Sequence, residues 1–389
     1  MTVSSRTHRP RVFAALLLAM FVVAIEATIV ATAMPSIVAS LGGMDLYSWV
    51  FSGFLLMQVL TVPIYGKLAD LFGRKRVFLA GSTVFLLGST LCALAHSMPA
   101  LVAARLVQGI GAGAVQSLTM TLLGDLYTRE ERARRQGYIS SVWGVSAILG
   151  PVMGGAIVAN AHWSWVFWMN LPVGAAYMLL VWHALHEQVE KKRAAIDYPG
   201  AALMLAGLAA LMLAFTQAGA WGPWAVAGML VLFALLFKAF VWRERHAPDP
   251  VMHLELWAKP VIAWGNAATF AAGAAMIGLI SFMPIFIQDV QHRSAFAAGV
   301  ALCVMSVGWP LASIVTARLM RRTTTRVLVR SGATLVLVGG LAVALFIEQG
   351  LAAAVIGSFV MGAGLGVLNA TVTVAIQSSV EWNQRGMAT

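Results

Sequence analysis

The sequence is poor in charged residues, and acids are the scarcest of them. Only 11% of its 389 residues are charged, and only 15 residues are Asp or Glu. An average soluble domain is about 25% charged and about 45–50% apolar. Here 60% of the chain is hydrophobic and the mean hydropathy is +0.83, which excludes the soluble classes of protein. Apolar runs of about twenty residues recur along the chain, and each can cross a bilayer as a helix.

Cysteine and the common catalytic motifs are also scarce. The two cysteines, Cys92 and Cys303, stand alone in apolar runs, which excludes a disulfide framework and a thiolate metal site. The segment His186-Glu-Gln-Val-Glu190 lacks the second histidine of a His-Glu-x-x-His zinc motif. No Gly-x-Ser-x-Gly elbow and no Walker A loop occurs. We therefore predict no enzyme, no ATP-driven pump, no metal and no cofactor; a proton gradient is the expected energy source.

Twelve apolar segments are candidate transmembrane helices. An all-α bundle is the expected fold, because a helix is the only open-ended element that satisfies its own backbone in lipid. The segments are residues 12–34, 46–65, 77–96, 99–121, 137–159, 164–185, 200–217, 224–242, 261–283, 296–317, 327–347 and 351–373. The first follows three arginines like a signal peptide, but it is too long for one and Glu26 interrupts it.

Lys and Arg alternate between crowded and nearly empty loops. Basic residues fill the N-terminus and the connections after the second, fourth, sixth, eighth and tenth segments, whereas the intervening connections hold only Arg293. By the positive-inside rule, the N-terminus and the basic loops are cytoplasmic. The net charge of +11 is therefore a topology signal, and we predict no nucleic-acid partner. The predicted location is the bacterial cytoplasmic (inner) membrane, with the lipid bilayer as a partner.

A weak internal repeat has an offset of about 250 residues. Three pairs of segments match in the same order: 66–76 with 317–326, 108–113 with 361–366, and 130–137 with 381–386. The offset covers eight predicted helices, which indicates six helices, two inserted helices and a second set of six.

The repeat predicts how the chain is divided. We expect an N-terminal six-helix bundle at 1–185, the inserted helices at 186–245 and the first four helices of a C-terminal bundle at 246–389. The second repeat stops at Thr389 where a fifth helix would begin, so the sequence predicts two missing helices. Two alternatives stay open: a genuine twelve-helix protein with unequal halves, and a nonfunctional fragment.

The first basic loop resembles the signature loop of the major facilitator superfamily. The residues of interest in it are Gly66, Asp70, Gly73, Arg74, Lys75 and Arg76. The glycines permit a tight turn between two helices, and the aspartate can meet a helix N-terminus or an arginine. The three basic residues suit the anionic inner leaflet. The resemblance implies a cytoplasmic gating loop; the alternative is a simple basic turn.

The fifth segment resembles the antiporter motif of the same superfamily. The residues that carry the resemblance are Gly144, Gly150, Pro151, Gly154 and Gly155. Small residues let helices approach closely, and a proline allows a bend. Plain small-residue packing is the alternative.

Two further segments resemble the fourteen-span drug:proton antiporter family: residues 25–37, which include Glu26, and Asp197-Tyr-Pro-Gly200. That family usually has aspartate where Glu26 stands, so the carboxylate is kept while its reach differs. The resemblance covers the whole chain. It implies a major facilitator fold, with two six-helix bundles and two inserted helices, and secondary transport by alternating access.

Glu26 is the one acidic residue well inside a predicted span, and such a group is a functional hypothesis by default. It lies about 21 Å from the inner end of its helix, and Arg105 lies about 9 Å from the outer end of the fourth. These depths coincide in a hydrocarbon core of about 30 Å. Arg105 also begins a segment that resembles the superfamily's fourth-helix motif, implicated in proton transfer. We predict that Glu26 binds the coupling proton and Arg105 modulates it; a structural ion pair is the alternative.

Other polar side chains at membrane depth can line a substrate cavity or join one helix to another. They are Thr28, Gln58, Gln108, Gln116, Asn266 and Asn369. Trp143, Trp264, Trp309 and the methionines are candidates for an adaptable apolar surface. We predict proton-coupled export of amphipathic drugs or toxic compounds, with periplasmic adaptor proteins as further candidate partners. An exporter of one specific metabolite or siderophore is the alternative.

Overall fold

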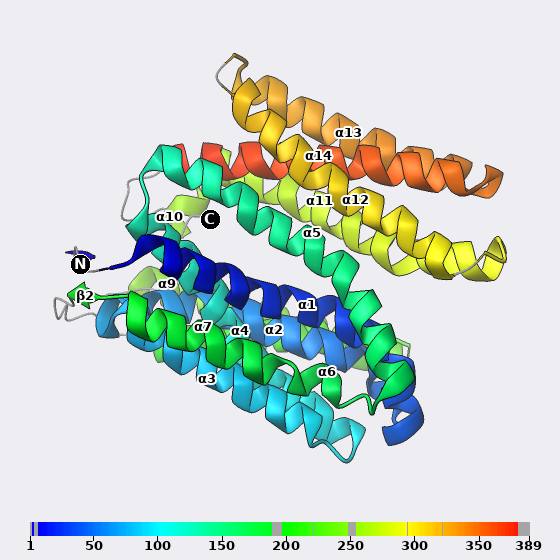
Figure 1. Ribbon diagram of the computed structural model, residues 1–389, viewed down its shortest axis with the longest axis horizontal. Helices are drawn as coiled ribbons and strands as arrows, with labels where there is room; N and C mark the ends of the chain where they lie inside the picture. The colour runs from blue at the N-terminus through cyan, green and yellow to red at the C-terminus, as the bar shows by residue number, and fades with distance from the viewer. Residues whose placement is uncertain are drawn as a thin grey trace. The chain divides into compact units, whose positions relative to one another are not determined.

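The structure is a computed structural model that describes residues 2–3, 7–188, 197–219, 221–247, 254–293, 295–320 and 322–379. The described chain is almost entirely helical (Figure 1). Its long helices are α1 (Arg9–Leu41), α2 (Tyr47–Phe72), α3 (Arg74–Ala93), α4 (Met98–Leu126), α5 (Arg129–Asn160), α7 (Asn170–Ala184), α8 (Tyr198–Thr216), α9 (Pro223–His246), α11 (Pro260–Ile285), α12 (Ala295–Leu319), α13 (Thr325–Phe346) and α14 (Leu351–Ser378). The short elements are η1 (Met44–Leu46), α6 (Trp165–Trp168), α10 (Leu254–Trp257), η2 (Phe286–Val290), η3 (Ile347–Gln349), and the paired strands β1 (Thr2–Val3) and β2 (Glu187–Gln188).

Helix lies over each of the twelve predicted segments. Among the described residues, 11 helices are long and apolar enough to cross a membrane. Helix α5 covers the fifth segment but is not one of those 11. The sixth segment is broken into α6 and α7, with Met169 between them. Pro172 in the first turn of α7 has no N–H to donate to the carbonyl of Trp168, which accounts for the break.

The chain forms two compact units. The first contains Met1–Arg132 and Leu149–Leu254, and the second contains Ala133–Ile148 and Glu255–Thr389. The inserted helices α8 and α9 belong to the first unit, and the predicted boundaries at 185 and 245 stay predictions. The predicted start of a further helix at Gly386 lies outside the described residues.

In the first unit, α1, α2 and α3 pack on α4, while α7 packs on α1 and α3 (Figure 1). Three glycines of α4 permit this packing. A Cβ at Gly109 would lie 2.4 Å from the carbonyl oxygen of Phe54 on α2, and one at Gly111 would lie 2.2 Å from the backbone nitrogen of Phe85 on α3. At Gly113 it would lie 2.1 Å from the Thr61 hydroxyl, again on α2. Each position therefore requires glycine.

In the second unit, α11, α12 and α13 pack on α14. Glycines again lie at the closest approaches, because a Cβ at Gly362 or Gly366 would lie 2.2 Å from a carbonyl oxygen of α12. A Cβ at Gly364 would lie 2.5 Å from the backbone nitrogen of Val336 on α13. The alternation of partners along α14 is the same as along α4, and the glycines involved lie in the matched segments 108–113 and 361–366.

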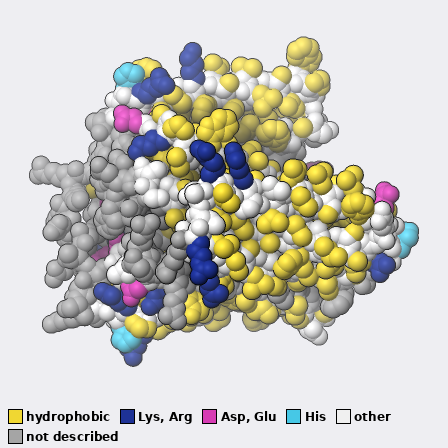
Figure 2. Space-filling model, turned by 90° about the horizontal axis from the view of Figure 1, so that it is seen from above, with side chains coloured by type: hydrophobic (Ala, Val, Ile, Leu, Met, Phe, Trp, Pro, Cys, Tyr) yellow, Lys and Arg dark blue, Asp and Glu magenta, His cyan; other side chains and the backbone are white. Residues whose placement is uncertain are grey.

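Large hydrophobic side chains remain exposed on helices of both units. Trp224 is 89% exposed, Phe270 is 79% exposed and Phe282 is 73% exposed. Hydrophobic side chains cover much of the face in view in Figure 2. Exposed apolar area on this scale suits contact with lipid rather than with water.

Candidate functional site

Glu26 and Arg105 meet in the interior of the first unit. Arg105 Nη1 on α4 lies 2.7 Å from Glu26 Oε2 on α1, and the two side chains are 1% and 0% exposed. The equal depths inferred from the sequence thus correspond to a direct ion pair. The remaining lone pairs and protons of a buried ion pair need partners of their own.

Three more side chains complete those hydrogen bonds. Gln108 accepts from Arg105 Nη1 at 2.7 Å and donates through Nε2 to Glu26 Oε1 at 3.0 Å. Asn170, at the start of α7, donates to the same Glu26 oxygen and to Ser89 Oγ on α3. Ser89 in turn donates to the carbonyl oxygen of Phe167. The Glu26 carboxylate therefore joins α1, α4 and α7, and through Asn170 also α3. We call Glu26, Ser89, Arg105, Gln108 and Asn170 the buried polar network.

Arg105 is held on its other sides as well. Its Nε donates to the carbonyl oxygen of Val50 at 3.0 Å, which ties the guanidinium to α2. The Phe54 ring lies over the guanidinium at 4.1 Å, and Phe167 lies at 6.0 Å. Cation–π contacts of this kind strengthen when the cation is desolvated. Arg105 on α4 thus contacts α1, α2 and α6. A change in the charge of Glu26 would therefore alter how Arg105 holds these three helices.

Helix α5 packs against the turn of α1 that carries Glu26. A Cβ at Gly150 would lie 1.9 Å from the Thr28 hydroxyl oxygen, and one at Gly154 would lie 3.0 Å from the carbonyl oxygen of Ile29. Nothing lies within 4 Å of the corresponding position at Gly155. Two glycines of the predicted antiporter motif therefore let α5 reach α1. The side chain of Pro151 lies outside the described side chains.

Gly144 of the same motif belongs to the second unit. A Cβ there would lie 3.2 Å from the carbonyl oxygen of Ser306 on α12. This contact is looser than the one at Gly150, so Gly144 tolerates substitution better.

The predicted gating loop is a sharp reversal between α2 and α3. Gly73 ends α2 with a φ of 94°, a conformation that favours glycine. Arg74 bridges two acids, with Nη2 3.0 Å from Asp70 and Nε 2.7 Å from Asp125 on α4. Asp70 thus meets an arginine, which is one of the two partners that the sequence left open. Gly66 lies near Ser117 on α4, and Arg76 is exposed.

The other predicted cavity residues are distributed over both units. Gln58 donates its amide to Gln116, which joins α2 to α4, and Thr28 donates to the carbonyl oxygen of Ile25 within α1. Gln108 lies in the buried polar network, and Asn266 is half-buried on α11. Their roles in a cavity stay predictions.

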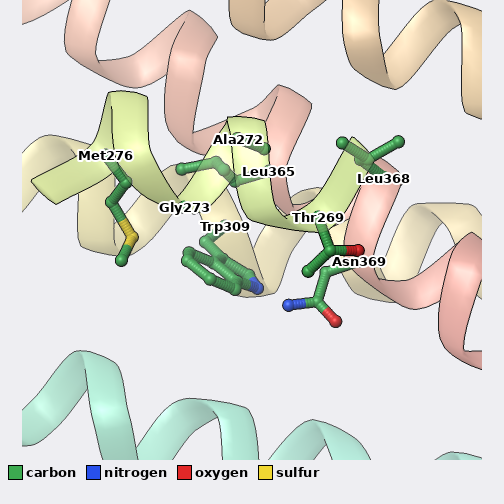
Figure 3. Close-up of a pocket in the computed structure, with 8 residues that line it drawn as sticks. All are labelled: Thr269, Ala272, Gly273, Met276, Trp309, Leu365, Leu368 and Asn369. Atoms are coloured by element: carbon green, nitrogen blue, oxygen red, sulfur yellow. The ribbon is translucent and has the colours of Figure 1, made fainter. Parts of the chain in front are cut away.

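Asn369 lies at a pocket within the second unit. The residues that line it are Thr269, Ala272, Gly273, Met276, Trp309, Leu365, Leu368 and Asn369. In Figure 3 the Asn369 amide and the Thr269 hydroxyl lie on one side of the Trp309 indole, with Met276 on the other. The pocket of about 50 Å³ is smaller than the roughly 300–1,000 Å³ of a site for a whole drug-sized ligand. It fits one ring or substituent that needs apolar contact and a hydrogen bond.

The residues that sequence reasoning missed are Ser89, Asn170, Asp125 and Glu187. Asn170 lies as many residues from the outer end of the sixth predicted segment as Arg105 does from the outer end of the fourth. Ser89 lies nearly as far along the third segment as Glu26 does along the first. The depth argument that paired Glu26 with Arg105 would therefore have found both. No comparable signal marks Glu187, which follows α7.

Comparison with known proteins agrees with this architecture. The family described as Major Facilitator Superfamily matches residues 16–389. The multidrug transporter protein MdtP of Bacillus subtilis is 32% identical over 389 residues, which cover 99% of this chain and 72% of that protein. Multidrug resistance protein 3 of the same organism is 35% identical over 303 residues, 77% of this chain and 59% of that protein. The xylose transporter XylE of E. coli, in a partially occluded inward-open conformation, shares the fold with a TM-score of 0.63 at 12% identity, covering 99% of this chain and 87% of that one.

Proposed function

Because this chain belongs to the Major Facilitator Superfamily, we propose that it exports amphipathic compounds in exchange for protons by alternating access. The observation that carries the proposal is the buried polar network, in which the sealed Glu26 carboxylate is paired with Arg105. The relatives with "multidrug" in their names support export of varied compounds.

The proton step follows from the network. When Glu26 binds a proton, the ion pair with Arg105 is lost and one carboxylate oxygen becomes a donor. Leaving one partner of a buried pair charged and uncompensated costs about 3–5 kcal/mol. Protonation therefore favours a different arrangement of α1 against α4, and release of the proton restores the first arrangement. A change of this size is enough to bias a two-state transporter.

The substrate step uses a different part of the molecule. The pocket around Trp309 offers an aromatic face, a flexible methionine and two hydrogen-bonding side chains, Thr269 and Asn369. Methionine and aromatic surfaces adapt to varied ligands. The pocket would take one apolar or aromatic portion of an amphipathic compound. Asp70 and Arg74 in the gating loop would close the cytoplasmic side, and the N-terminus would be cytoplasmic in a bacterial inner membrane.

The test uses the purified chain in liposomes with an imposed pH gradient and ethidium as an amphipathic aromatic probe. Wild type should move ethidium against its gradient when protons flow down theirs. Glu26→Gln keeps the shape of the side chain but cannot exchange a proton, so gradient-driven movement should be lost. Ethidium exchange at equal pH should persist in this variant, which shows that it is folded.

The matched control is Glu348→Gln, because Glu348 is exposed in η3, which follows α13, and undergoes the same chemical change. Its gradient-driven transport should equal that of wild type. Wild-type pH-gradient dependence in Glu26→Gln would overturn the proposal, and so would a wild-type protein that moves no ethidium and none of a panel of amphipathic dyes.

A further inference from the structure

The start of α3 is capped by a carboxylate from a distant segment. Glu187 accepts hydrogen bonds from the backbone nitrogens of Arg74 through Oε2 and Lys75 through Oε1, both at 2.9 Å. Gly73, the residue before the helix, supplies no side-chain cap of its own. An anion at a helix N-terminus satisfies its unpaired N–H groups and interacts favourably with the helix dipole. Glu187 thus supplies what the glycine turn lacks.

The same two helix ends also make the reverse contact. Lys75, in the first turn of α3, donates through Nζ to the carbonyl oxygen of Trp182 at 2.6 Å, and its ammonium lies 5.2 Å from the Trp182 ring centre. Trp182 is in the last turn of α7, where carbonyl groups lack partners and a cation is favoured. The segment that follows α7 therefore caps the start of α3, and a side chain of α3 caps the end of α7. We call Lys75, Trp182 and Glu187 the helix-end clasp.

Residues near the N-terminus contact the segment that carries Glu187. β1 pairs with β2, so that Val3 lies opposite Glu187. Thr7 and His186 exchange two hydrogen bonds, of 2.7 and 3.0 Å, and the His8 nitrogen donates to the carbonyl oxygen of Ala184 at 3.0 Å. These contacts fix the backbone on both sides of Glu187. Residues 2–3 and 7–8 thus form a strap over the segment that carries the capping carboxylate.

We infer that Glu187 is a positioning residue for the gating loop. Its two hydrogen bonds fix the first turn of α3, and Arg74 in that turn places its guanidinium between Asp70 and Asp125. Without the cap the first turn frays, and Arg74 has to order itself as it forms each ion pair. The clasp thereby sets how readily the loop leaves its present arrangement. This inference rests on the proposed transport function only for its kinetic consequence.

The structural arm of the test is amide hydrogen exchange, measured on the purified full chain. Glu187→Gln removes the charge and leaves one accepting oxygen, so exchange at residues 74 and 75 should accelerate about tenfold. Glu187→Asp keeps the charge with a shorter reach and should fall between wild type and Glu187→Gln. Glu348→Gln is the matched control, because Glu348 is exposed in η3 of the second unit, and the same chemical change there should leave exchange at residues 74 and 75 unaltered. Unchanged exchange in Glu187→Gln would overturn the inference.

The kinetic arm uses ethidium transport in liposomes. Glu187→Gln should lower turnover about threefold or more while KM changes by less than about twofold, because no residue of the loop lines the proposed substrate pocket. Deletion of residues 2–6 should act in the same direction. Its effect should not add to that of Glu187→Gln, because both act through one clasp.

The two arms separate two kinds of failure. Faster exchange with normal turnover would overturn the positioning role, as would additive effects of the deletion and Glu187→Gln. If wild type moves no substrate, the transport proposal fails, and the exchange experiment still decides whether Glu187 holds the loop.

Discussion

Helices α4 and α14 are the central helices of the two repeats, and they pack in the same way. Gly109, Gly111 and Gly113 on α4 meet α2, α3 and α2 in turn, and Gly362, Gly364 and Gly366 on α14 meet α12, α13 and α12. The position just before each first glycine is equivalent too. The backbone of Gln108 lies against Gly88 of α3, and the backbone of Met361 lies against Gly339 of α13.

The side chains on this shared frame differ in chemistry. Arg105 and Gln108 precede Gly109 by four residues and one residue, and Ser358 and Met361 hold those places before Gly362. Where Arg105 forms an ion pair, Ser358 donates to the sulfur of Met283 at 3.4 Å. The packing of a repeat and its charge are therefore separable properties.

The difference shows that two helices with the same glycine packing can carry side chains of different chemistry. Backbone contacts at the glycines set the spacing between helices. This spacing does not depend on the side chains that the other positions of α4 and α14 carry. On α4, Arg105 and Gln108 belong to the buried polar network, whereas on α14 Leu365, Leu368 and Asn369 line the pocket around Trp309. In the proposed function, the first repeat handles protons and the second handles substrate.

The largest expected effect tests the charge difference. Arg105→Ala would leave the buried Glu26 carboxylate with amide donors only, so the free energy of unfolding should fall by about 3–5 kcal/mol. Ser358→Ala, at the equivalent place, removes one neutral hydrogen bond and should cost about 1 kcal/mol. Denaturant unfolding of the purified protein in detergent measures both.

A second variant distinguishes the cost of an uncompensated charge from the cost of lost packing at residue 105. In the Arg105→Ala background, Glu26→Gln should recover part of the lost stability, because it removes the uncompensated charge. Equal costs for Arg105→Ala and Ser358→Ala would break the comparison.

The next effect tests the shared frame. A Cβ at Gly111 would lie 2.2 Å from a backbone nitrogen of α3, and one at Gly364 would lie 2.5 Å from a backbone nitrogen of α13. Alanine at either place should lower the free energy of unfolding by a similar amount, about 1–3 kcal/mol. Gly340→Ala is the control, since nothing lies within 4 Å of its added carbon. A large cost at only one of the two glycines would show that the repeats pack differently.

A smaller effect compares the two parts of α5. Gly150→Ala would collide with the Thr28 hydroxyl on α1, and Gly144→Ala would only approach the carbonyl oxygen of Ser306. We expect Gly150→Ala to cost up to about 2 kcal/mol of stability and Gly144→Ala to cost less. Thr28→Ala should relieve part of the Gly150→Ala defect, because it removes the nearest atom. No relief in the double variant would show that the collision is not the cause.

Several of these features follow from the sequence because they depend on position along a helix. The apolar runs predict the helices, and helix rise alone predicts that Glu26 and Arg105 share a depth. The orientation inferred from the alternating loops stays a prediction. The glycines of α4 and α14 follow from the repeat. Each of these inferences uses the sequence of one segment, or a comparison of the sequences of two segments.

The remaining features depend on which helix lies beside which. That Gln108 turns toward Glu26 rather than toward a cavity depends on how α4 is rotated about its axis. That Glu187 caps α3 depends on where the chain leaves α7, and no local pattern near residue 187 encodes this. Asp125 is found only once α4 is known to end beside the loop that carries Arg74.

The smallest expected effect tests the substrate side of the comparison. Asn369→Ala removes the amide beside Trp309 in the pocket of the second unit. The KM for a hydrogen-bonding amphipathic probe should rise about threefold to tenfold, the size expected for one lost hydrogen bond. The pH-gradient dependence of transport should not change, because the buried polar network lies in the first unit. Asn160→Ala at the end of α5 is the control, since that amide is exposed and does not line the pocket. If Asn369→Ala instead removed the pH-gradient dependence and left KM alone, the assignment of protons to one repeat and substrate to the other would be wrong.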